Sequence, residues 1–162
     1  RWFGIDRENS KLTVLGEREF DIDQIGYKYH LNDLTAALGL GNLEDFSYII
    51  SRRKEIAKKY RQNLENIPGL KLLEYKSDRQ SSNWLFTMLV EDRLGFVQKM
   101  NESNIPVSIV HQRIDRFSVF DGVTQGLVNQ KKFSEKQIAI PLHSNLNNME
   151  VENIIDIIKS GW

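Results

Sequence analysis

The amino-acid sequence predicts an α+β fold, in which helices pack on one face of a small, mainly antiparallel sheet. Apolar residues recur at helical spacing before residue 66 and after residue 147. Between these segments the period changes, and short apolar runs alternate with turn-forming residues. The expected order is helix, helix, strand, strand, helix, strand and a terminal helix.

The first half of the chain is expected to be mostly helical. Residues 1–25 mix turn formers with a short alternating piece, so they predict little regular structure and at most one short strand. Asn32 can cap a helix, and Asp33 suits the positive end of its dipole. A longer helix is expected over residues 43–66, stopped by Pro68 and Gly69. The expected apolar face of the first helix comprises Leu34, Ala37, Leu38 and Leu40.

The second half predicts the sheet and its remaining helices. Strands are expected over residues 70–75, 84–91 and 105–110, with a short extended piece over 137–141. Trp84, Phe86 and Met88 alternate along the second strand and are expected in the core. Helices are expected over residues 94–104, 128–136 and 147–160. The apolar stripe expected on the last helix is Val151, Ile154, Ile155 and Ile158.

Composition excludes several classes of function. The 162 residues include 22 basic and 22 acidic ones, and a net charge of zero argues against a nucleic-acid binder. With no cysteine, the chain has no disulfide, thiolate metal site or cysteine nucleophile, and a reducing, cytoplasmic location is expected. No apolar run approaches the roughly 20 residues that cross a bilayer, so no membrane association is expected. The three histidines do not follow the spacing of a metal site, and none is expected.

A turn before the first helix places a lysine and a histidine together. Lys28 and His30 alternate with Tyr27 and Tyr29, so an extended backbone would point both polar side chains to one side. They precede a helix start, where free amides and the dipole favour an anion such as phosphate. The alternative is that both side chains are simply solvated.

Two further sites carry histidine or arginine near a strand end. His111 is followed by Arg113 and Arg116, whose guanidinium groups could hold a diphosphate. The alternative, which the sequence alone favours, is a solvated loop with an ion pair between arginine and Asp115. Taken by itself, His143 is more typical of a histidine that makes structural hydrogen bonds at a strand end than of one that binds a ligand.

Four segments, in order, resemble the DegT/DnrJ/EryC1/StrS family of sugar aminotransferases. Residues 26–40 resemble its glycine-aromatic turn followed by a helix rich in Ala-Ala-Leu-Gly. Residues 52–60 resemble its Arg-Arg-x-x-Ala-x-x-Tyr run, and residues 140–143, Ile-Pro-Leu-His, resemble its Pro-Leu-His before the closing helix. Residues 1–6 resemble the segment that trails the cofactor domain, so the likeness covers essentially the whole chain.

The resemblance implies that this chain is the C-terminal small domain of a fold type I enzyme. Residues 1–31 would be the tail of a missing cofactor-binding domain with an active-site loop, and residues 32–162 the C-terminal α+β domain. The parent would be a homodimer that uses pyridoxal phosphate to transfer an amino group from glutamate to a keto sugar on a nucleoside diphosphate. Its Schiff-base lysine would lie upstream of Arg1, so the chain alone is expected to be inactive.

The same resemblance suggests roles for individual residues. Lys28 would reach across the dimer interface to the phosphate of the cofactor in the neighbouring site. The residues that would border the sugar nucleotide are His30, His111, Arg113 and His143. The alternative to the whole interpretation is a stand-alone, non-catalytic α+β module for dimerisation or small-molecule binding.

Overall fold

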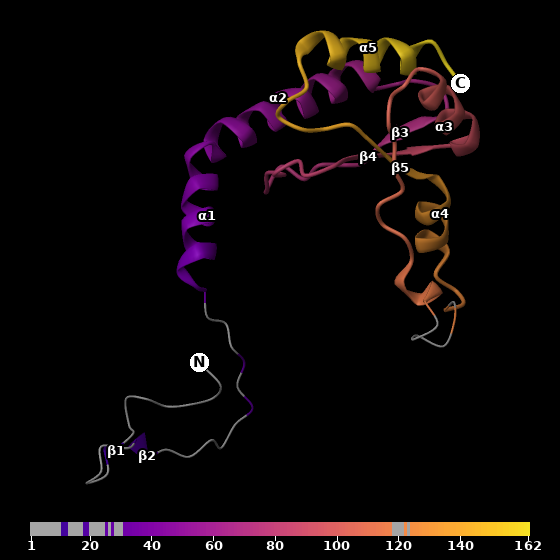
Figure 1. The fold of residues 1–162 in the computed structure, drawn as a ribbon. Helices are drawn as coiled ribbons and strands as arrows, with labels where there is room; N and C mark the ends of the chain where they lie inside the picture. Colours follow the sequence, from indigo (N-terminus) through magenta and orange to yellow (C-terminus); the bar gives the residue numbers. More distant parts are fainter. Residues whose placement is uncertain are drawn as a thin grey trace. The chain divides into compact units, whose positions relative to one another are not determined.

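The computed structural model describes residues 11–12, 18–19, 25, 27, 31–117, 122 and 124–162. The chain divides into two compact units, Arg1–Asp45 and Phe46–Trp162 (Figure 1), and each is considered by itself. In the first unit, strands β1 (Lys11–Leu12) and β2 (Arg18–Glu19) pair antiparallel, with Lys11 opposite Glu19. Two short strands therefore form where the sequence predicted at most one.

Helix α1 (Asp33–Glu44) begins where the sequence predicts. The side-chain oxygen of Asn32 accepts a hydrogen bond from the backbone amide of Thr35 at 2.9 Å, which confirms the predicted cap. None of its residues is buried, and its leucines are strongly exposed: Leu34 80%, Leu38 71%, Leu40 67% and Leu43 61%. At about 100° per residue, Leu34 and Leu43 lie on opposite sides, so α1 has no single apolar face.

The second unit holds a three-stranded antiparallel sheet with strand order β3-β4-β5. Phe86 pairs with Ile140, Met88 with Ile138, and Leu72 with Met88. The elements of this unit are α2 (Phe46–Leu64), β3 (Leu70–Leu72), β4 (Phe86–Val90), α3 (Arg93–Glu102), the short 3-10 helix η1 (Ile114–Arg116), α4 (Val128–Lys136), β5 (Gln137–Ile140) and α5 (Asn148–Lys159).

The core lies between the sheet and helices α2, α3 and α5. Phe86, Met88 and Val90 alternate along β4 and are buried, because successive side chains of a strand point to opposite faces. Tyr60 of α2 meets Phe86 edge-to-face at a centroid distance of 5.1 Å. The predicted stripe of α5 is confirmed, since all four of its residues are buried: Val151, Ile154, Ile155 and Ile158.

Helix α4 departs from the prediction that helices cover one face. Figure 1 shows α2 and α5 on one side of the sheet and α4 on the other. Leu89 points away from the core because it alternates with the buried Met88 and Val90, and α4 lies along that outer face with no buried residue of its own. The sheet therefore has a covered inner face and a lightly covered outer face.

The predicted strand over residues 105–110 is reduced to a single bridge. Only Ser108 pairs, through two backbone hydrogen bonds with Ala139 of 3.1 and 2.8 Å. Pro106 has no amide to donate, which shortens the ladder. The core placement expected for Trp84 is wrong as well, because β4 begins at Phe86 and Trp84 is 65% exposed.

Across the described residues, no helix combines the length and the apolar character that crossing a membrane requires.

Candidate functional site

Lys28 and His30 lie outside the described residues, but the helix start that follows them is described. The oxygen Oδ1 of Asn32 accepts two hydrogen bonds of 2.9 Å, one from the backbone amide and one from the hydroxyl of Thr35. Asp33 adds a negative charge to the first turn. One amide of α1 is therefore already paired and a carboxylate stands beside it, so the described residues by themselves do not favour an anion here.

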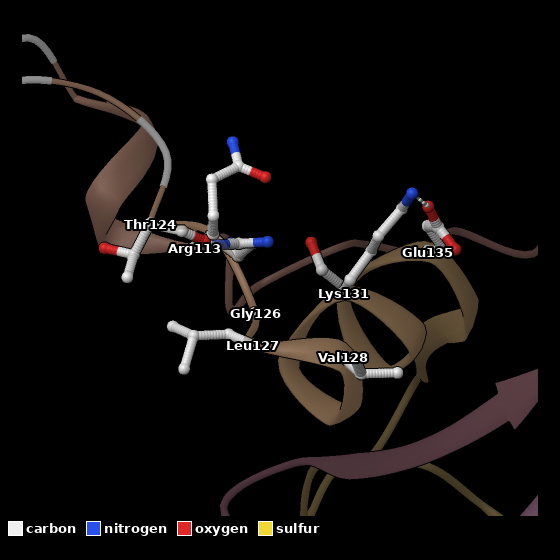
Figure 2. A pocket seen from close by; sticks show the side chains of 9 residues that line it. Arg113, Thr124, Gly126, Leu127, Val128, Lys131 and Glu135 are labelled. Carbon is white, nitrogen blue, oxygen red and sulfur yellow. Dashed lines mark hydrogen bonds and ion pairs between the residues drawn. The ribbon is translucent and has the colours of Figure 1, made fainter.

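A pocket of about 430 Å³ lies between the segment that follows η1 and one side of α4. Figure 2 shows Arg113 and Thr124 on one side of it and Lys131 and Glu135, from α4, on the other. Its walls also include Gly126, Leu127 and Val128. We call this the loop–α4 pocket.

Arg113 is held in place by Asp115. Its guanidinium donates from Nε to Oδ1 at 2.9 Å and from Nη2 to Oδ2 at 2.5 Å. Nη2 also donates to the carbonyl of Thr124 at 3.1 Å, and the Thr124 amide donates to Asp115 Oδ2 at 2.9 Å. This clasp joins the two ends of the segment between residues 113 and 124.

The hydrogen bonds of this clasp favour the charged forms of Asp115 and Arg113. Hydrogen bonds from Arg113, and then from the Thr124 amide, lower the pKa of Asp115 to about 2. Hydrogen bonding to Asp115 raises the pKa of Arg113. The ion pair is the one that the sequence alone favoured, and the predicted contact of Arg113 with a sugar nucleotide stays a prediction.

Lys131 brings a second cation to the loop–α4 pocket. Its Nζ lies 3.9 Å from Glu135 Oε1, and both side chains are exposed, so this ion pair restrains the ammonium only weakly. Gly126, with φ +81°, turns the chain into α4, whose first residues have no side-chain cap at Leu127. The pocket is therefore lined by two cations, of which Arg113 is paired with Asp115 and Lys131 lies near Glu135.

One described histidine has its carbonyl beside the first residue of β5, and the other follows the last residue of that strand. The carbonyl of His111 accepts a hydrogen bond from Gln137 Nε2 at 2.7 Å, which places His111 beside the start of β5. His143 follows Ile140, the last residue of β5, by three residues. Neither histidine lines the loop–α4 pocket, so the structure groups Arg113 with Lys131 rather than with His111 or His143.

Each histidine has a defined neighbourhood. The exposed ring of His111 meets Trp84 edge-to-face at a centroid distance of 6.3 Å. His143 is exposed, and its carbonyl accepts the amide of Leu146 at 3.2 Å. Just before it, the Pro141 carbonyl accepts the Tyr60 hydroxyl at 2.9 Å, which ties the segment to α2.

Sequence reasoning missed Lys131 and Glu135. The available signal was the Gln125-Gly126 turn directly before a helix with no apolar face, which places polar side chains of α4 next to the loop. In the part of the chain that the structure describes, no group of three His, Asp or Glu side chains could hold a metal ion.

Comparisons with solved structures give a consistent result. The fold is similar to the sugar aminotransferase CalS13 of Micromonospora echinospora, with a TM-score of 0.89 and 28% identity. It is also similar to AtS13 of Actinomadura melliaura, with a TM-score of 0.88 and 30% identity. Each alignment covers 100% of this chain but only 43% and 42% of the other protein.

Sequence comparison leads to the same group of proteins. A dTDP-4-dehydro-2,3,6-trideoxy-D-glucose 4-aminotransferase of Saccharopolyspora spinosa is 28% identical over 138 residues, which are 83% of this chain and 36% of that protein. The chain thus spans less than half the length of the relatives that it matches. Residues 1–159 match the family model as well, and the chain belongs to the DegT/DnrJ/EryC1/StrS aminotransferase family.

Proposed function

We propose that this chain is the C-terminal part of a nucleotide-sugar aminotransferase that transfers an amino group from glutamate to a keto sugar on a nucleoside diphosphate. The observation that carries the proposal is the match of the whole chain to the sugar aminotransferase CalS13, and of 83% of it to a nucleotide-sugar aminotransferase, over less than half of either protein. Catalysis then requires residues outside these 162, which include the Schiff-base lysine.

Helix α1 supports the proposal that residues 1–31 and 32–162 belong to a larger, homodimeric assembly. A helix that is apolar on all sides is normally buried on all sides. Leu34 and Leu43 lie on opposite sides of α1, and both are exposed. Contact with more polypeptide, from the cofactor-binding domain and the second subunit, would remove these leucines from water.

Aminotransferases of this family depend on pyridoxal phosphate, which would act as an electron sink and carry the amino group from donor to acceptor. We propose that the Lys28 ammonium binds the phosphate of the cofactor in the neighbouring subunit as a point charge. The residues proposed to border the sugar nucleotide are His30, His111, Arg113 and His143. Arg113 lines the loop–α4 pocket, and this supports a place for it at a ligand site.

A stand-alone, non-catalytic module is the less favoured function. CalS13 and the Saccharopolyspora spinosa protein, which this chain resembles over most of its length, are aminotransferases. A small-molecule-binding module would also leave the exposed leucines of α1 without an explanation. A cytoplasmic location, expected from the absence of cysteine, remains part of the proposal.

The test compares the protein encoded by the complete gene with the 162-residue chain. Each is supplied with pyridoxal phosphate, glutamate and dTDP- or UDP-linked keto sugars, and 2-oxoglutarate is measured. We expect turnover by the complete protein and none by the isolated chain. Turnover by the isolated chain, or a complete protein that aminates none of these sugars, would contradict the proposal.

A lysine substitution tests the proposed cofactor contact. Lys28→Ala in the complete protein removes one charge-assisted hydrogen bond, worth about 1.5–3 kcal/mol, so the dissociation constant of the cofactor should rise about 10–100-fold and cofactor should be lost on dialysis. Lys58→Ala, on the exposed surface of α2, is the matched control and should retain the cofactor. Equal retention by the two variants would remove Lys28 from the phosphate site.

A further inference from the structure

A second hollow lies on the other side of α4 from the loop–α4 pocket. It measures about 570 Å³ and is bounded by β3, the end of β4 and α4. Its α4 wall is formed by Lys132, Phe133 and Lys136, whereas Lys131 and Glu135 line the first pocket. Lys132 follows Lys131 by one residue, or about 100° around the helix, so the two hollows use different faces of α4. We call this second hollow the sheet–α4 groove.

The face of α4 that borders the groove has an unusual composition. Residues at spacing i, i+3, i+4 and i+7 form one stripe, and a helix on a sheet normally places apolar residues there. In α4 the stripe carries Asn129, Lys132, Phe133 and Lys136, so only one of its four members is apolar. The composition is poor for packing on the sheet and suitable for a polar ligand with one flat apolar part.

The groove carries excess positive charge. Lys132 and Lys136 face it from α4, Lys71 faces it from β3, and Glu91 is the one carboxylate in its lining. Among the described residues, none of the three lysines has a recorded ion pair or hydrogen bond, whereas Lys131 on the other face has its weak pair. Three cations and one anion leave a local charge of about +2, the complement of a phosphomonoester dianion.

An apolar wall completes the groove. Leu89 pairs with Lys71 across the sheet and presents its half-buried side chain to the outer face, opposite the half-buried Phe133. An aromatic ring can stack on Phe133 while the lysines hold its charge. The volume lies within the range of about 300–1,000 Å³ that is typical of small-molecule sites.

We infer that the sheet–α4 groove binds a phosphomonoester that carries a flat ring, of the class of nucleoside monophosphates and aryl phosphates. The phosphate lies among Lys71, Lys132 and Lys136, and the ring lies between Phe133 and Leu89. This site is independent of the proposed aminotransferase function, because its residues belong to the second unit and none lines the loop–α4 pocket.

The test is an NMR titration of the 162-residue chain with UMP, phenyl phosphate, uridine and inorganic phosphate. We expect UMP and phenyl phosphate to shift the amide signals of Leu89 and Phe133, with weaker binding at about 0.15 M salt than at low salt. Tighter binding of UMP would identify nucleotides as the source, and tighter binding of phenyl phosphate would identify aryl phosphates. Inorganic phosphate that binds as tightly as both would overturn the role of the apolar wall, and uridine that binds as tightly as UMP would overturn the role of the lysines.

Variants of neighbouring lysines locate the ligand. The double variant Lys132→Gln/Lys136→Gln should raise the dissociation constant for UMP at least about tenfold, since it removes two of three cations. Lys131→Gln is the matched change on the other face of α4 and should alter it less than about twofold. The melting temperature of each variant checks that it is folded. The reverse order, with Lys131→Gln the more damaging change, would place the ligand in the loop–α4 pocket and overturn the inference.

Discussion

Replacing Tyr60 by phenylalanine tests whether one buried hydroxyl joins α2 to the segment that leads to His143. Tyr60 is fully buried, and its hydroxyl donates to the Pro141 carbonyl at 2.9 Å. Burial raises the pKa of this hydroxyl above its usual range, so it remains a donor at all ordinary pH values. Phenylalanine keeps the ring and its edge-to-face contact with Phe86 at 5.1 Å, so the substitution isolates the hydrogen bond.

The expected loss follows from the surroundings of the two partners. A hydrogen bond contributes about 0.5–1.5 kcal/mol net, and a carbonyl left buried without a donor costs about 1–3 kcal/mol. Pro141 is half-buried, so water can replace part of the lost bond. We therefore expect Tyr60→Phe to lower the free energy of unfolding by about 1–1.5 kcal/mol. With a slope of about 2 kcal/mol per molar urea, the midpoint should fall by roughly 0.5–0.8 M.

Urea unfolding followed by far-ultraviolet circular dichroism measures the midpoint. Tyr48→Phe is the matched control, because Tyr48 lies on the same helix and its side chain is 63% exposed. Loss of the Tyr48 hydroxyl should cost less than about 0.5 kcal/mol, since that hydroxyl is bonded to water in the folded and the unfolded chain. If Tyr60→Phe lowers the midpoint no more than Tyr48→Phe does, the argument from burial is wrong.

Two further predictions concern local interactions. Because Asp115 has a pKa of about 2, its pairing with Arg113 stabilises the folded chain fully above the unfolded-state value near 4, and this contribution is lost as the pH falls towards 2. The Thr124 amide signal in an NMR pH titration should therefore shift with a midpoint near 2, and a midpoint near 4 would contradict the clasp. Asn147→Ala removes one half of the capping box with Glu150 and should cost about 1 kcal/mol in thermal unfolding, whereas Glu150→Gln keeps both hydrogen bonds and should cost less.

The parts of the fold that the sequence predicts well are those in which local and tertiary signals agree. In α5 the cap at Asn147 and the apolar stripe from Val151 to Ile158 indicate the same helix and the same buried face, and both are observed. Phe86 and Met88 are likewise buried where alternation predicts. Each of these residues finds its partners within the second unit.

The predictions that fail involve residues at the ends of such patterns. Alternation extends from Met88 back to Trp84, but periodicity does not show where the sheet stops, and Trp84 lies beyond the start of β4. Ile109 and Val110 favour a strand by type, yet only Ser108 finds a partner backbone in Ala139. Strand pairing is a long-range property, so residue preference alone overestimates the length of a strand.

The candidate site is harder to predict than the fold because its members belong to different units. Lys28 and His30 are part of the first unit, and His111, Arg113 and His143 of the second. A periodic apolar pattern identifies the buried face of each element, but it carries no information on the distance between residues of different units. Within the second unit the clasp of Asp115 orients Arg113 into a pocket that neither described histidine lines. The apolar pattern of α1 is equally uninformative about a partner, because its exposed leucines lie on opposite sides of the helix and define no single face.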